Sequence, residues 1–356
     1  MRSCKRFVQF IIVIFLCNHV QSQSCAVSDN MMNITGIWKK NEDFIEPGKN
    51  CKPEIKTGIY KRLNNIQQII QSAYSPPKGS EVHWSRDIMG TPLARSNCAT
   101  YSLSVMMFED FCDVVDHKLK HEDETDNLLD VYVNFPNGYF FFDTAMKIGH
   151  MYVAEMYYRV GKIKDVDLFQ TSLVRGNSRF IVIARNGQLP YIPLTKKQYL
   201  SVLKTKFINE EKWMMERSFS VAKNDADKSR AEQYSKSQYE PKIKRVDDYL
   251  SSATENDLNQ LAFVKDMQDF KKFYTEQEGG RMTVIVNKDY FNNALDPVAP
   301  QFLLIRWEWN DGEGPAGGLL RPKPPDMDVC CRISKYYKES IENNLDITAL
   351  QQLLDK

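Results

Sequence analysis

The sequence lacks an excess of charge of either sign. Its 47 lysine and arginine residues nearly balance 46 aspartate and glutamate residues, which gives a formal net charge of +1 over 356 residues. A clustered or large excess of basic residues is the usual mark of proteins that bind nucleic acid or anionic membranes through charge. The charge balance gives no support to such functions, and we expect no nucleic-acid partner.

Sequence motifs of common catalytic and cofactor sites are also missing. The chain contains no Gly-x-Ser-x-Gly nucleophile motif and no His-Glu-x-x-His zinc motif. The glycine-rich stretch 312–318 lacks the Lys-Ser/Thr pair of a phosphate-binding loop. Residues 311–314, Asp-Gly-Glu-Gly, lack the alternating acidic positions of a calcium-binding EF-hand. No cofactor is predicted, and a non-enzymatic function is favoured.

Long apolar runs are confined to the N-terminus. Three basic residues within positions 2–6 precede an apolar stretch at 7–16, and small residues suited to cleavage follow at 20–24. The apolar stretch is too short to span a bilayer. The pattern predicts a signal peptide over residues 1–22 and export to the periplasm or the extracellular space. Lipid attachment at Cys25 is an alternative, and we expect no transmembrane segment in the mature chain.

Cysteine is sparse but even in number after the signal peptide. Six cysteines remain there, and an even count in an exported protein favours disulfides. The spacing suggests Cys98 with Cys112, and Cys25 with Cys51, whereas the adjacent Cys330 and Cys331 would pair with distant partners or stay free. The sequence does not choose among the possible connectivities.

The stretch 179–207 organises the rest of the pattern. Residues 180–184 form a β-branched apolar run typical of a buried strand. Asn186-Gly187 favours a tight hairpin, and Pro190 and Pro193 limit the returning strand to a short edge position. Thr195 and Gln198 have the spacing of a capping box, which predicts that a helix begins there.

Other elements follow from alternation and helical spacing. We expect strands at 81–87, 100–107, 129–135, 139–143, 151–158, 282–286 and 301–309, and helices at 59–73 and 333–356. The polar stretch 223–238 is expected to form either a long solvated helix or a flexible arm, and Pro241 is expected to end it. Together these elements predict an α+β fold, in which an antiparallel or mixed sheet of roughly six to nine strands packs against helices. A helical hairpin over 196–274 is expected to project from that sheet.

The chain is expected to divide into two regions after the signal peptide. Residues 23–178 form an N-terminal helix followed by a β-rich region. Residues 179–356 form a strand, helical-hairpin and strand region that completes the same sheet.

Cys98 and His150 are the best nucleophile-and-base candidates in the chain. A cysteine hydrolase needs a thiolate and an imidazole that generates it, and each of these residues opens an apolar run. No family signature surrounds either residue, and a Cys98–Cys112 disulfide explains the cysteine equally well. A cysteine hydrolase is therefore the enzymatic alternative.

His117 and His121 are four residues apart and would share one face of a helix. Such a pair can bind zinc, with Glu122 or Asp123 nearby. Most neighbouring residues are charged, so a solvated loop is the favoured interpretation and no metal is predicted.

Aromatic residues are the main clue toward binding. Consecutive aromatics at 139–142 place two side chains on each face of a strand, so that one face is either covered or presents an apolar patch. We therefore predict a ligand-binding surface that includes Phe140, Phe142, Trp307 and Trp309. Gly36-Ile37-Trp38 resembles the Gly-x-Trp opening of lipocalin-like proteins, which implies a carrier of a small hydrophobic ligand as another alternative.

Three segments carry a family resemblance: Ser-Pro-Pro-Lys-Gly from residue 75, Asn-Gly-Gln-Leu-Pro-Tyr-Ile-Pro-Leu-Thr from residue 186, and Pro-Gln-Phe-Leu-Leu-Ile-Arg-Trp from residue 300. They resemble segments of uncharacterised exported proteins of Bacteroidota-type bacteria. The resemblance implies an exported bacterial protein and supplies no activity, cofactor or catalytic residue. The leading hypothesis is an exported binding or interaction protein whose partner is a small molecule, a glycan or a protein at the cell envelope.

Overall fold

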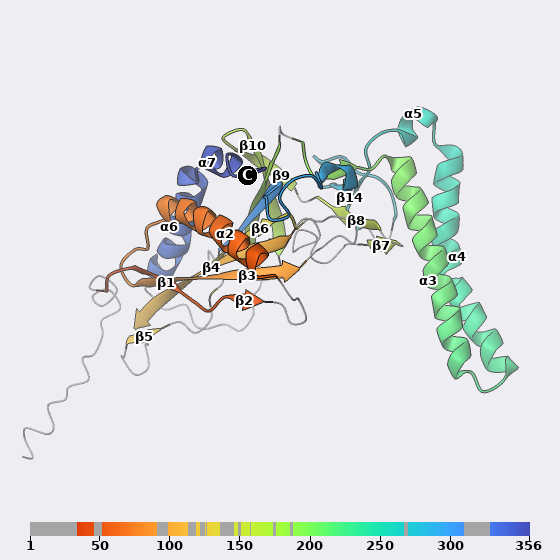
Figure 1. The fold of residues 1–356 in the computed structure, drawn as a ribbon. Coiled ribbons are helices and arrows are strands. Elements are labelled where there is room, and N and C mark those ends of the chain that lie inside the picture. The colour runs from red at the N-terminus through yellow and green to blue at the C-terminus, as the bar shows by residue number, and fades with distance from the viewer. Residues whose placement is uncertain are drawn as a thin grey trace, which may run out of the picture.

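The structure of this chain is a computed structural model. It describes residues 34–45, 52–90, 99–112, 119–121, 125, 127–135, 146–148, 151–156, 158–173, 176–185, 188–266, 270–309 and 328–356. The arrangement of helices around a mixed sheet confirms the predicted α+β class (Figure 1). The predicted strand 139–143 and its turn at 136–138 lie outside the described residues.

Within the part of the chain that the structure describes, ten strands form a large mixed sheet. Its main path has the order β1-β3-β4-β6-β15-β11-β10-β9, with β2 paired to β3 and β5 paired to β4. The two short strands β1 and β2 run parallel to β3, whereas the other pairs in this sheet are antiparallel. The strands are β1 (Ile37–Lys40), β2 (Phe44–Ile45), β3 (Ser80–Gly90), β4 (Thr100–Cys112), β5 (Leu119–His121), β6 (Leu128–Val133), β9 (Tyr158–Ile163), β10 (Val166–Leu173), β11 (Gly176–Ala184) and β15 (Phe302–Trp309).

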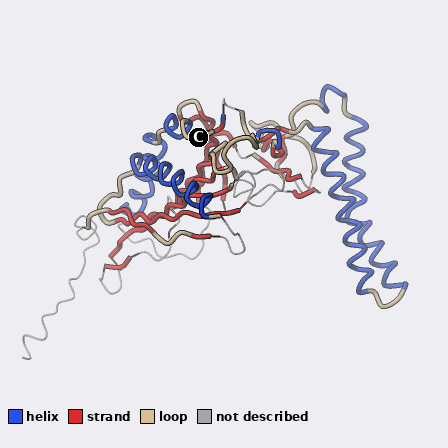
Figure 2. The backbone as a smooth tube through the Cα atoms, in the orientation of Figure 1, coloured by secondary structure: helices blue, strands red, loops and turns tan. Residues whose placement is uncertain are grey.

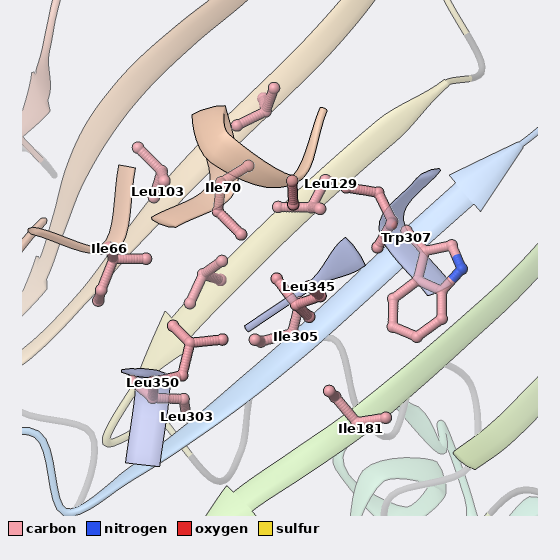
Figure 3. Packing of buried hydrophobic residues seen from close by; sticks show 14 of the residues in the cluster. Ile66, Ile70, Leu103, Leu129, Ile181, Leu303, Ile305, Trp307, Leu345 and Leu350 are labelled. Atoms are coloured by element: carbon pink, nitrogen blue, oxygen red, sulfur yellow. The ribbon is translucent and has the colours of Figure 1, made fainter. Parts of the chain in front are cut away.

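One face of the large sheet is covered by α2 (Pro53–Ala73), α6 (Asp328–Asn344) and α7 (Ile347–Gln351). The apolar residues of α2 recur at helical spacing and are buried, which is why the predicted helix forms and which side it presents to the sheet. Figure 3 shows the resulting core, where Ile66 and Ile70 of α2 meet Leu103 and Leu129 of the sheet.

Strand β15 lies at the centre of this sheet, and its side chains alternate between the two faces. Leu303, Ile305 and Trp307 point toward the helices and belong to the main core. Phe302 and Leu304 point to the opposite face and belong to a second apolar cluster. The strand is therefore buried on both faces over most of its length.

A smaller sheet covers part of that opposite face. It has the order β12-β14-β8-β7, with β13 paired to β14. Its residues Ala154, Tyr191 and Val284 pack in one cluster with Phe180 and Leu304 of the large sheet. The strands are β7 (Met146–Ile148), β8 (Met151–Glu155), β12 (Tyr191–Pro193), β13 (Phe263–Val264) and β14 (Arg281–Val286), and a short 3-10 helix, η3 (Lys288–Tyr290), follows β14.

The predicted hairpin between residues 180–184 and 191–193 is wrong, although the short edge strand is present. Strand β12 pairs with β14 in the small sheet rather than with β11. Strand β11 pairs with β15 from Asn177 to Ala184 and with β10 from Gly176 to Ile181. Most of its length is therefore already paired on both edges.

A helical hairpin projects from the small sheet as an arm, as predicted (Figure 2). It consists of α3 (Lys196–Val221) and α4 (Asp225–Ser252), and the short α5 (Glu255–Leu258) leads back to the sheet. The buried residues of α3 end at Phe207, so the distal part of the arm is a helix pair exposed to solvent. Among the described residues, no helix combines the length and apolarity needed to cross a membrane.

Two helix predictions need correction. Pro241 lies inside α4 and does not end it. Because Ser237, four residues earlier, and Pro241 itself are exposed, solvent can satisfy the carbonyl group that loses its helical donor. The C-terminal helix predicted at 333–356 is divided into α6 and α7, because Asp346 caps a new helix with a hydrogen bond from the Ala349 amide.

The capping box at the start of α3 gives a direct stability prediction. The Thr195 hydroxyl accepts a hydrogen bond from the Gln198 amide at 3.2 Å, and the Gln198 side chain accepts one from the Thr195 amide at 2.9 Å. Thr195→Ala should lower the free energy of unfolding by about 1 kcal/mol, because an amide at the helix start loses its acceptor. Urea denaturation measures the change. Ser201→Ala is the matched control, since that hydroxyl bonds back to the Lys197 carbonyl within the helix and should have a smaller effect.

Candidate functional site

The large sheet has a polar surface on the face that points away from α2 and α6. Alternation along β4, β6 and β15 sends Leu103, Val131 and Ile305 into the core, so their neighbours project from the other side. In the strand register Ser104 lies beside Asp130, and Asp130 lies beside Arg306. Three adjacent strands therefore place a hydroxyl, a carboxylate and a guanidinium side by side.

This polar surface forms the floor of a pocket of about 420 Å³. The volume falls within the range of roughly 300–1,000 Å³ that is usual for small-molecule sites. Polar groups lie at the floor, and apolar residues from three strands, β2, β3 and β6, contribute to the walls. The lining residues are Phe44, Asp87, Ile88, Met89, Ser102, Ser104, Leu128, Asp130, Tyr132 and Arg306.

Asp130 is well satisfied by hydrogen bonds. Its carboxylate accepts from Arg306 Nη2 at 2.6 Å, from Ser104 Oγ at 2.8 Å and from the Tyr132 hydroxyl at 3.2 Å. Arg306 also forms an ion pair with Glu308, in which Nη1 lies 3.3 Å from the carboxylate. Asp130 and Arg306 are both buried, so this network fixes the floor of the pocket.

Asp87 is far less well satisfied. Its Oδ2 atom lies 3.4 Å from the hydroxyls of both Ser102 and Ser104. A serine hydroxyl has one proton to donate, and that of Ser104 has the shorter contact with Asp130. Among the described residues, no lysine or arginine lies within ion-pair distance of Asp87. Burial and the neighbouring charge of Asp130 raise the pKa of the Asp87 carboxyl.

The charges around the pocket favour a cation. Asp87, Asp130 and Glu308 supply three carboxylates, and Arg306 supplies one positive charge in the same group of contacts. A positive ligand group beside Asp87 would offset the burial of its charge and fill its remaining acceptor positions. The apolar wall residues would contact an uncharged part of the same molecule.

The two predicted tryptophans lie on the other side of the sheet. Trp307 is 0% exposed and Trp309 is 4% exposed, and both belong to the core between the sheet and the helices. The Trp307 ring nitrogen donates a hydrogen bond to Glu342 at 3.2 Å. Phe140 and Phe142, predicted to share their surface, lie outside the described residues.

The other sequence candidates have different outcomes. Cys98, His150 and His117 lie outside the described residues, as do Cys25 and Cys51. His121 is the last residue of β5, where it lies opposite Asp110 of β4. The structure therefore places it on a strand and brings it near residues other than those considered from the sequence.

The Gly36-Ile37-Trp38 segment has a local structural explanation. A side chain at Gly36 would place its Cβ atom 2.3 Å from the carbonyl oxygens of Pro76 and Pro77, so only glycine fits this close approach. The Trp38 ring packs edge-on against Tyr74 with 6.4 Å between centroids. Both residues thus join β1 to the end of α2.

The sequence interpretation missed Asp87, Asp130 and Arg306 as site residues. A signal was present for two of them, because Asp130 and Arg306 are charged residues in mostly apolar strands, whereas β3 around Asp87 is rich in polar residues. The sequence does not reveal the order of the strands in the sheet, which decides which side chains lie next to one another.

In comparisons with protein-family models, curated proteins and solved structures, nothing matches this chain.

Proposed function

We propose that this chain is an exported binding protein that holds a small cationic molecule in the pocket on the polar face of the large sheet. The observation that carries the proposal is Asp87, a partly buried carboxylate at the pocket floor with only long contacts to two shared hydroxyls. The N-terminal signal-peptide pattern supports export. The ligand class is a primary amine with an apolar part.

The geometry supports an amine over an anion or a neutral apolar ligand. An ammonium group donates three hydrogen bonds and accepts none, which suits a floor rich in carboxylate oxygens. An anion would lie against Asp87 and Asp130, because Arg306 is already engaged by Asp130 and Glu308. A purely apolar ligand would cover the polar floor without replacing its contacts with water.

A matched set of ligands tests the proposal. Phenethylamine, 2-phenylethanol and phenylacetate share an aromatic part and differ in the charge at the other end. Calorimetric titration of the purified chain should detect binding of phenethylamine, weaker binding of the alcohol and none of the acid. Asp87→Asn should remove the preference for the amine, whereas Asp225→Asn, at a fully exposed position on the arm, should keep it. Equal binding of the amine to Asp87→Asn and to the unmodified chain would rule out the proposed role of Asp87.

The same residue gives a separate prediction for the protein without ligand. Because the pKa of Asp87 is raised in the folded protein, by burial first and then by Asp130, its ionised form costs stability. Its contribution is favourable at acid pH and is lost as pH rises through the raised pKa. Asp87→Asn should therefore stabilise the free protein at neutral pH.

Thermal unfolding of both proteins across the acid range measures this effect. The stability advantage of Asp87→Asn should be present at pH 7 and should disappear as the pH falls below about 3.9, the ordinary value for an unfolded aspartate. The charges of Asp130 and Asp43 also raise the pKa of Asp87, and both residues remain in the variant. A destabilised Asp87→Asn protein at neutral pH would contradict the prediction.

A further inference from the structure

A second group of polar residues lies on the same sheet face, toward the other end of β3. Glu81 and His83 are on β3, and His121 is on β5, which reaches them across β4. Each of the three residues offers one ligand atom, and these atoms all lie within 4.8 Å of one another. No residue of this group lines the pocket described above.

The side chains of this group are already arranged by contacts. Glu81 Oε2 lies 2.9 Å from His83 Nε2. The rings of His83 and His121 are 6.2 Å apart at an angle of 24°, and the Phe108 ring contacts both of them. The two imidazoles therefore face one another over an aromatic side chain that restricts their rotation.

Asp110 orients the second histidine. Its Oδ1 atom lies 2.9 Å from His121 Nδ1, and the two residues are direct partners in the pairing of β4 with β5. A carboxylate at Nδ1 fixes the proton on that nitrogen and presents Nε2 as the electron-pair donor. Histidines that bind metals are commonly held by a carboxylate in this way.

We propose that Glu81, His83 and His121 bind one zinc ion, with Asp110 as the positioning residue for His121. Imidazole nitrogen and carboxylate oxygen suit zinc at distances of about 2.0–2.2 Å, which corresponds to roughly 3.4 Å between ligands in a tetrahedral arrangement. The Glu81–His83 contact is already shorter than this, so His121 supplies most of the closing movement. Three protein ligands leave a fourth position for water or an exogenous ligand.

A zinc ion would compete with the Lys39 ammonium group for the Glu81 carboxylate. Lys39 Nζ lies 3.4 Å from Glu81 Oε2, and its side chain is 56% exposed. An exposed lysine pair of this kind contributes little free energy, so it can turn to solvent when a divalent ion binds.

Zinc titration of the purified chain against a chromophoric chelator tests the site, with cysteines alkylated beforehand to remove thiolate ligands. We expect one zinc ion per chain. His83→Gln and His121→Gln should each abolish binding, and Asp110→Asn should weaken it by about 10–100-fold, the usual effect of losing a carboxylate behind a metal-bound histidine. Ser85→Ala, on the same face of β3, should bind as the unmodified chain does.

His117→Gln separates this site from the pair considered from the sequence. It should retain full binding if Glu81, His83 and His121 are the ligands. Retention of zinc by His83→Gln, together with its loss from His117→Gln, would overturn the proposal in favour of the His117–His121 pair. Circular dichroism of each variant checks folding, and Co²⁺ spectra of the alkylated chain should show a four-coordinate site without a thiolate charge-transfer band. A six-coordinate cobalt spectrum would also count against the proposal.

Discussion

Replacing Trp307 with alanine should lower the free energy of unfolding by about 3–5 kcal/mol, the range for removing a large buried aromatic side chain. The side chain is 0% exposed and lies between β15 and the covering helices (Figure 3). Its removal leaves a cavity in a close-packed core and deprives Glu342 of the indole donor. Urea denaturation followed by circular dichroism would measure the loss.

Trp213→Ala is the matched control for this change. Trp213 lies on the arm and is 56% exposed, so its replacement should change the unfolding free energy by no more than about 0.5 kcal/mol. The pair of variants also tests the surface that the sequence predicted around Trp307. A binding platform would lose ligand affinity with little loss of stability, whereas the core position requires a large loss of stability. A loss below about 1 kcal/mol for Trp307→Ala would contradict the core assignment.

Arg281→Met should cost a similar amount, about 3–5 kcal/mol, because it breaks a buried ion pair by removing one partner. Arg281 Nε lies 2.6 Å from the Glu155 carboxylate, and the Glu155 side chain is 1% exposed. The two residues join β14 to β8 in the small sheet. Without the guanidinium, the Glu155 charge remains in a site from which water is excluded.

A double variant separates the lost attraction between Arg281 and Glu155 from the cost of burying the Glu155 charge without the Arg281 guanidinium. Glu155→Gln combined with Arg281→Met should recover much of the stability, because the double change removes both charges. Thermal unfolding at neutral pH would compare the single and double variants. Lys212→Met, which breaks the exposed pair with Glu216 on the arm, is the control and should cost less than about 1 kcal/mol. A double variant as unstable as Arg281→Met alone would show that the loss is not electrostatic.

Local signals account for the parts of the fold that the sequence predicts well. The capping box of Thr195 and Gln198, the apolar spacing of α2 and the alternation of β15 each depend on residues a few positions apart. Pairing between strands depends on competition along the whole chain. The turn signal near residue 186 predicted a hairpin, but β12 pairs with β14, a strand about ninety positions later in the chain, and β11 pairs with β10 and β15.

The candidate sites depend on that same long-range pairing. Asp130 and Arg306 are 176 positions apart, and they meet only because β15 inserts beside β6. His121 was predicted to share a helix face with His117. In the structure, β5 pairs with β4 and brings His121 near His83 instead. The residue types are visible in the sequence. Which residues lie next to one another in space follows from the order of the strands in the sheet, which local sequence patterns do not give.

The position of β15 also constrains how the chain folds. This strand joins β6 on one side to β11 on the other, yet it follows both of them by well over a hundred positions. Until β15 pairs, the strands on its two sides can join only as two separate halves with exposed edges. Such long-range closure is slow compared with helix formation, and open strand edges favour aggregation. The folding chain is therefore open to association with other copies until this central strand is in place.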